Sequence, residues 1–374
     1  MGKMFRHCVN LTDLDVSNFK TDKVEDMSSM FYDCASLKYI DVSKFNTANV
    51  KTFSLFVKDC YLLTSLDISK FNTSKVVDLS NMFNNCQNLE KVDVSKFDTS
   101  KVTDMNYMFN ECQKLTSIGI SSFNTENVED MSAMFRNCKL VTKLDIQNFS
   151  TKKVADMSMM FDGCSSLISL DISKFNTSLV KDMYSMFNGA SLLTYIDLSN
   201  FETNTCKDMS QMFEVCNSLT SIDLSKFNTE NVEDMNGMFK SCNNIEIKGL
   251  DNFNTKKVKD MSNMFYSCEK IKSLNLEYFI TNEVYDMSGM FGFCKNIEKI
   301  EKINFDTINV KTMEQMFNGC NKLIDINIKN FNTKEVRKMD DMFSYCSSLT
   351  SLDLSNFDTN KVEKMDRMFR DVIN

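Results

Sequence analysis

A repeat of fixed length constrains this chain more than any other feature. Phenylalanine recurs every 26 residues from Phe19 to Phe357, without an insertion or a deletion. Threonine stands two residues later in all fourteen repeats, from Thr21 to Thr359. A constant period over almost the whole length predicts a solenoid, in which each repeat packs only against its neighbours. We therefore expect residues 1–374 to form a single solenoid domain and not several globular domains.

Both ends of the sequence lie in the middle of a repeat. The pair Met4-Phe5 opens the sequence, and the pair Met368-Phe369 stands close to its last residue. Neither end shows an atypical capping repeat, which solenoids usually need to cover their terminal apolar faces. The sequence therefore indicates a solenoid truncated mid-repeat at both ends. It is then either a fragment of a longer protein, which we favour, or a solenoid with ends that stack on another molecule.

Two periodicities follow one another within each repeat. Leu14 and Val16 alternate with aspartate, which predicts a short β-strand with one buried face. Met27, Met30, Phe31 and Cys34 are spaced by three and four, which predicts one face of a short helix or 3₁₀ turn. Asp26 or Ser28 would cap that helix, and a second short strand around residues 24–27 is the alternative. The predicted fold class is an α/β repeat solenoid with about fourteen coils, in which the strands form a parallel ladder.

The same columns predict the core. In one repeat the usual Met, Met and Phe become Phe53, Phe56 and Val57, so two enlargements are offset by one reduction, as a close-packed layer requires. The cysteines form a column in which Ala190 replaces one member without other change. A disulfide ladder or a metal wire is the alternative, but side chains stacked in register cannot surround a tetrahedral ion, so we interpret the cysteines as small buried residues.

The pattern L-x-x-L-x-L-S-x-F-N-T-x-x-V-x-D-M-S-x-M-F-x-x-C, seen over residues 4 to 369, resembles the 26-residue repeat of bacterial surface proteins. Those proteins belong to the BspA-type group of leucine-rich-repeat proteins. The resemblance implies a curved leucine-rich-repeat-like solenoid, display outside the cell, and a role in adhesion or in binding a host extracellular or surface protein. Similar repeats in proteins of eukaryotic microbes and viruses have a less certain location.

Composition excludes several classes of function. The formal charge of −8 and the pI near 5.0 argue against a basic surface for nucleic acid or anionic lipid. No apolar stretch is long enough to span a membrane, and no export signal is evident. With one histidine and no phosphate-binding or nucleophile motif, the chain is predicted not to be an enzyme, and a glycan-processing enzyme is a distant third possibility. No cofactor is expected.

Carboxylates raise one possibility of a metal. Aspartates at the outward strand position form a column that includes Asp15, Asp41, Asp67 and Asp93, and a second run from Asp145 to Asp223. Stacked like charges should raise the carboxyl pKa values or attract cations, so calcium at the first run is a weak possibility. A solvated face that keeps the strands soluble is the simpler interpretation.

A partner site should break the repeat, because a uniform surface recognises nothing in particular. After about residue 225 the outward strand positions become irregular, and Ile247 with Lys248 suggests a local slip in register. Aromatic residues replace small polar ones on the same face, and these are typical binding anchors. The candidate partner-binding residues are Tyr39, Tyr195, Asp171, Asp197, Asp223, Ile247, Lys248 and Tyr278.

These observations predict a non-enzymatic protein-binding or adhesion surface. The alternative is an intracellular interaction scaffold with the same fold. We expect a cell-surface or secreted location if the chain is part of a longer exported protein, and a cytoplasmic location if it is complete. End-to-end stacking through the uncapped ends is a further possible interaction.

Overall fold

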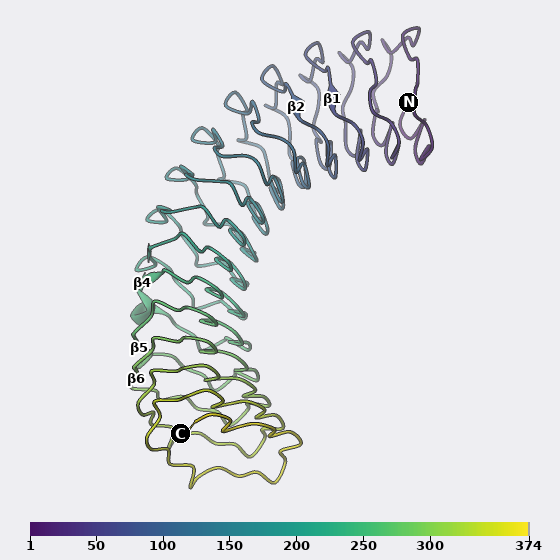
Figure 1. Ribbon diagram of the computed structural model, residues 1–374. Coiled ribbons are helices and arrows are strands. Elements are labelled where there is room, and N and C mark those ends of the chain that lie inside the picture. Colours follow the sequence, from purple (N-terminus) through teal and green to yellow (C-terminus); the bar gives the residue numbers. More distant parts are fainter. Residues whose placement is uncertain (373–374) are drawn as a thin grey trace. The chain divides into compact units, whose positions relative to one another are not determined.

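A computed structural model describes residues 1–372, which form two compact units. The first unit contains residues 1–180 and 189–200, and the second contains residues 181–188 and 201 onward. Within each unit the chain winds into successive 26-residue coils that stack side by side (Figure 1). The fold class is therefore a leucine-rich-repeat-like solenoid, as predicted. That the two units make one continuous solenoid remains a prediction.

Among residues 1–372, six short β-strands occupy the predicted strand position, on what we call the strand wall. All pairs are parallel, and they form three separate two-stranded sheets. The prediction of one continuous strand ladder is therefore wrong, because hydrogen bonding between coils is concentrated on the opposite wall. In the first unit β1 (Ser65–Leu66) pairs with β2 (Lys91–Val92), and in the second β3 (Ser221–Asp223) pairs with β4 (Glu246–Lys248) and β5 (Ser273–Asn275) with β6 (Lys299–Glu301).

The opposite wall, which we call the turn wall, carries no helix in the described residues at the position where one was predicted. In the coil containing Met105, the N–H groups of Met105, Tyr107 and Phe109 donate to carbonyls of the next coil at 2.8–3.1 Å. The intervening N–H of Met108 instead donates to the Met105 carbonyl at 3.3 Å. Tyr107 has a φ of 53°, a left-handed conformation that a helix excludes. The segment is thus a ribbon of tight turns, whose three-and-four spacing imitates a helix.

Parallel bridges complete this wall at the position of the alternative second strand, but each is an isolated bridge and not a strand. They join equivalent residues of successive coils in each unit, as at Asp104 and Asp130. The aspartates predicted to cap helices cap turns instead, since Asp130 Oδ1 accepts the N–H of Ser132 at 2.8 Å.

Side chains between the two walls form the predicted core. Met105, Met108, Phe109 and Cys112 are fully buried, and so are their equivalents in the other interior coils. Phenylalanine rings stack from coil to coil, with centroids 5.4 Å apart between Phe83 and Phe109. The compensating set Phe53, Phe56 and Val57 is also fully buried, which confirms it as a layer of the core.

The threonine column joins neighbouring coils. Thr151 is 1% exposed, and its hydroxyl donates to the Asn176 carbonyl at 2.8 Å. The same hydroxyl oxygen accepts the Asn176 N–H at 2.7 Å. Most interior threonines provide the same two-way hydrogen bond at the corner of the coil, as Thr47 and Thr307 do.

One coil of the second unit departs from the 26-residue register, as the isoleucine pattern suggested. Ile247 pairs with Ile222, an offset of 25 residues, and Lys248 pairs with Asp223. Gly249 follows with a φ of 89° and absorbs the displaced residue as a bulge. The 3₁₀ turn η1 (Leu250–Asn252) then restores the register, and Leu250 returns to the core.

Candidate functional site

The three predicted anchor tyrosines project from the strand-wall side of their coils. Tyr195 is 64% exposed, Tyr39 is 58% exposed and Tyr278 is 57% exposed. In the first unit Tyr195 lies two residues before Asp197, and Asp171 occupies the same position as Asp197 in the preceding coil. These three side chains therefore share one surface, whereas Tyr39 lies six coils earlier.

The remaining candidates lie in the second unit. Asp223 and Lys248 are bridge partners in β3 and β4, and Ile247 precedes Lys248. Ile247 is half-buried and Lys248 is exposed, so this pair lies at the edge of the register slip. The structure therefore brings Asp223, Lys248 and Ile247 together. Tyr278 follows β5, in the coil after that of β4.

The outward carboxylates are more acidic than predicted. Asp171 Oδ1 accepts the hydroxyl of Ser173 at 2.7 Å and its N–H at 3.1 Å, and these bonds lower the pKa of Asp171. The same hydrogen bonds from the serine two residues later lower the pKa of Asp197 and of Asp223. The expected rise from stacked charges was therefore wrong for this column, because a local donor outweighs repulsion between solvated carboxylates.

Two aspartates on the turn wall show the rise in pKa that was expected for the outward column. Burial raises the pKa of Asp104 to about 6, with smaller contributions from Asp78 and Asp130. Burial likewise raises the pKa of Asp234 to about 6. Desolvation, which grows with burial, decides the direction at these two carboxyls, whereas at Asp26 desolvation is outweighed by hydrogen bonds from Ser28, which lower the pKa.

Several exposed aliphatic side chains on the strand-wall side escaped the sequence analysis. In the first unit Ile168 is 53% exposed, Leu192 is 49% exposed and Leu140 is 47% exposed. Each occupies a position where other repeats carry Ser, Thr, Asn or Lys, and that departure was the available signal. Ile168 and Leu192 lie in the coils that carry Asp171 and Tyr195, so they extend this surface with apolar area.

The cysteine and methionine columns supply packing and not a site. All cysteines from Cys34 onward are buried, which confirms their interpretation as small core residues. Their thiols also donate to carbonyls, as from Cys112 to Phe83 at 3.2 Å, an interaction that the sequence did not predict. Burial raises the pKa of Cys34 to about 12, so its thiol is a poor nucleophile.

Among residues 1–372, no group of three or more His, Cys, Asp or Glu side chains is placed to hold a metal ion. At the aspartate run considered for calcium, Asp67 and Asp93 each use one oxygen to accept from the serine two residues on. No helix within the same residues is long and apolar enough to cross a membrane.

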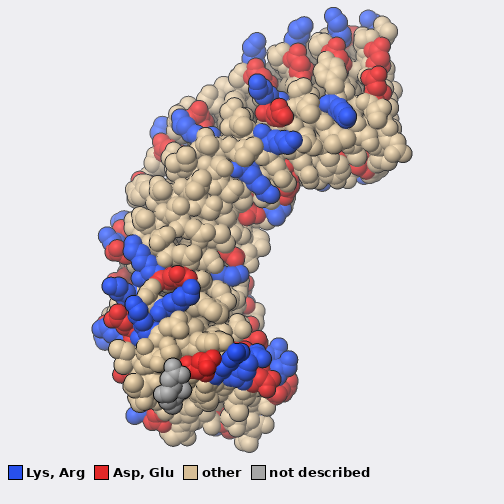
Figure 2. Space-filling view, in the orientation of Figure 1, with Lys and Arg blue, Asp and Glu red and all other residues tan. Residues whose placement is uncertain are grey.

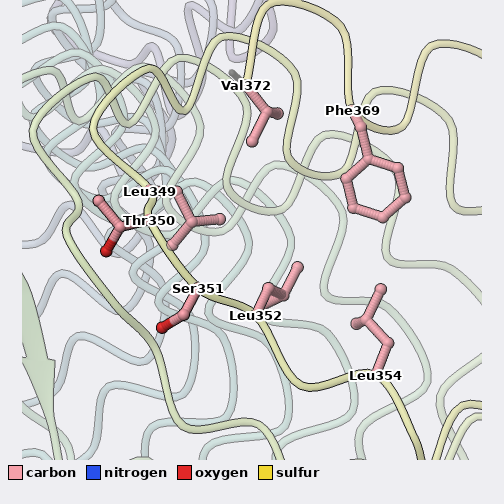
Figure 3. A pocket seen from close by; sticks show the side chains of 7 residues that line it. All are labelled: Leu349, Thr350, Ser351, Leu352, Leu354, Phe369 and Val372. Atoms are coloured by element: carbon pink, nitrogen blue, oxygen red, sulfur yellow. The ribbon is translucent and has the colours of Figure 1, made fainter. Parts of the chain in front are cut away.

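A concavity of about 380 Å³ lies beside the last described coil. Figure 3 shows the side chains of Leu352, Leu354 and Phe369 around one space, with Val372 above it and Leu349 to its left. The described lining is apolar apart from the hydroxyls of Thr350 and Ser351. On the face shown in Figure 2, lysine and arginine are interspersed with aspartate and glutamate.

Several solved leucine-rich-repeat structures are similar to this chain. One, from Bacteroides ovatus, is 16% identical, with 81% of this chain and 78% of that chain covered and a TM-score of 0.38. Another, from Eubacterium ventriosum, is 14% identical over 85% and 79% of the two chains, with a TM-score of 0.39. A leucine-rich cell surface protein from Faecalibacterium prausnitzii is 15% identical over 79% and 78%, with a TM-score of 0.31.

The comparison with curated proteins gave no match. One protein family matches along the whole sequence, at residues 1–65, 54–143, 137–248, 233–323 and 293–374. Overlapping matches of this kind are what tandem repeats produce, in accord with the resemblance to 26-residue-repeat proteins. The chain belongs to this family, described as "Mycoplasma protein of unknown function, DUF285".

Proposed function

We propose that this protein is a non-enzymatic protein-binding surface, in which a rigid repeat scaffold presents side chains from the strand-wall side of its coils. The observation that carries the proposal is the exposure of Tyr39, Tyr195 and Tyr278, each more than half accessible where other repeats carry small or polar residues. Tyrosine supplies a large, stiff contact area at low entropic cost, which suits an interface anchor.

The charge around these tyrosines supports recognition of another protein. Serine hydrogen bonds lower the pKa values of Asp171 and Asp197, so both stay ionised at neutral pH beside Tyr195. An exposed aromatic ring flanked by apolar and charged side chains is the usual anatomy of an interface centre and rim. Affinity would come from a few anchors combined with many weak contacts along the coils.

For location we propose display at the cell surface or secretion, with adhesion as the biological role. The support is the resemblance of the repeat to those of surface proteins. Intact cells treated with an external protease provide the test. Loss of the protein is expected under this proposal, and full protection of it in intact cells, with cleavage after lysis, would contradict it.

The binding role is tested with the immobilised full chain and proteins from the organism's surroundings. Binding of a captured and purified partner should weaken at least tenfold in Tyr195→Ala or Tyr278→Ala, with the melting temperature nearly unchanged. Tyr285→Ala is the matched control, because Tyr285 is 44% exposed but lies away from the strand wall. Equal affinity for all variants would contradict the assignment of these tyrosines.

A further inference from the structure

The register slip in the second unit is accompanied by a groove on the strand wall. A cavity of about 360 Å³ lies between the coil of β4 and the coil of β5. Its size is in the range that accommodates a bound side chain or short segment. It is lined by Ile245, Glu246, Ile247, Lys270, Ile271, Lys272, Ser273 and Leu274.

At this groove one step of the coil-to-coil hydrogen bonding is missing. The N–H of Glu246 donates to the Thr220 carbonyl at 3.0 Å, and the N–H of Glu298 donates to the Lys272 carbonyl at 2.8 Å. Among the described backbone bonds, the equivalent bond from Lys272 to Glu246 does not form. The same bond is absent between some regular coils of residues 1–372, as from Thr116 to Glu90. What distinguishes this step is the one-residue displacement of β4 toward β3, which puts β4 out of step with β5.

The lining combines an apolar floor with a charged rim. Ile245, Ile271 and Leu274 form the floor and are 1–7% exposed, and half-buried Ile247 stands at the edge. Lys270 and Lys272 are exposed on one side, and within the described residues neither forms an ion pair. Glu246 is the single carboxylate in the lining. Lysine and arginine are visible along the edge where β4 to β6 lie, mixed with acidic side chains (Figures 1 and 2).

We propose that this groove binds an extended acidic segment of a partner protein. An apolar side chain of the segment enters between Ile247 and Leu274, and its carboxylates face Lys270 and Lys272. The unbonded N–H of Lys272 gives the segment's backbone a donor, in the manner of a strand added to a sheet edge. This inference rests on the proposed protein-binding function and assigns to it a site and a class of partner.

The test uses labelled nine-residue peptides and fluorescence anisotropy with the full chain. One peptide alternates glutamate and valine, a second alternates lysine and valine, and a third replaces the valines of the acidic peptide with proline. The acidic valine peptide should bind at least tenfold more tightly than either of the others. The proline peptide keeps the charge but loses the N–H groups of the replaced residues and the extended pairing geometry.

Two changes to the protein test the location. K270E/K272E should weaken the binding of the acidic peptide at least tenfold. K38E/K114E changes the same two repeat positions in the first unit and should leave that binding unchanged. Replacing residues 243–253 with the regular sequence of residues 217–227 restores the 26-residue register and should also abolish binding while the protein stays folded. Unchanged binding in either groove variant, or preference for the lysine peptide, would overturn the proposal.

This experiment separates the two proposals. A protein partner that depends on Tyr195 and Tyr278, in a chain that does not bind the acidic peptide, would overturn the groove and leave the binding function standing. If the groove variants lose peptide binding and Tyr195→Ala keeps it, the result supports the groove as a binding site independently of the tyrosines.

Discussion

Single side chains with two hydrogen bonds each hold neighbouring coils together. The buried Thr151 hydroxyl both donates to and accepts from Asn176 in the next coil. Thr151→Val keeps the shape but leaves a buried N–H and a carbonyl unpaired, so the free energy of unfolding should fall by about 2–3 kcal/mol. Denaturant unfolding of the variant measures this.

The control is Thr359→Val, because Thr359 belongs to the same column but is exposed. Its effect should stay within about 0.5 kcal/mol, as for other surface substitutions. A loss at Thr151 no larger than that at Thr359 would show that the threonine column is not what joins the coils.

Asp234, on the turn wall, makes the free energy of unfolding depend on pH. Because burial raises its folded pKa to about 6, above the value near 4 for an unfolded chain, the folded state binds the proton more tightly. Its contribution to stability is therefore full below pH 4 and is lost as the pH rises through 6. Asp234→Asn should raise the free energy of unfolding at pH 7 by about 1–2 kcal/mol, after allowance for partial solvation.

Unfolding of both proteins at pH 5, 6 and 7 checks this result, and the difference should shrink as the pH falls. Asp223→Asn is the control, since hydrogen bonds from Ser225 lower the pKa of that exposed carboxyl. A destabilised Asp234→Asn at pH 7 would contradict the assigned direction.

The strand β4 and the turn after it depend on one glycine. Gly249 has a φ of 89°, and a Cβ at this position would lie 2.4 Å from the Ser225 nitrogen. Gly249→Ala should therefore destabilise the protein by about 2 kcal/mol or more. Gly119→Ala, at the same repeat position, has no contact closer than 3.6 Å and should change stability little. Thermal melting compares the two, and equal effects would contradict the bulge.

Some elements could be read from the sequence and others could not, for physical reasons. Burial of Phe109 and Met105 followed from the period alone, because a residue's place in its repeat fixes which side of the coil it occupies. The turn ribbon at residues 105–111 could not be distinguished from a helix, since both place side chains at three-and-four spacing on one face. Its defining feature, the positive φ at Tyr107, has no residue signature, because Ser, Asn, Leu and Met occupy that position elsewhere.

The candidate surface was only partly predictable. Tyr195 stands out because an aromatic replaces a small residue, and the structure shows it exposed. Ile168 and Leu192 were missed because an aliphatic residue near a strand is ordinarily assigned to the core. The groove beside Ile247 required the pairing register, which the sequence only suggested.

At the scale of the whole molecule, our central claim is that backbone hydrogen bonds join the coils mainly on the turn wall. These bonds form at the same positions in every repeat. Amide hydrogen exchange along the full sequence tests it most directly. Amides equivalent to Met105, Tyr107 and Phe109 should be protected in every interior coil with a 26-residue period, whereas residues 116–120, which make no backbone bond to another coil, should exchange quickly. Protection that is strongest on the strand wall, or that lacks the 26-residue period, would contradict the account.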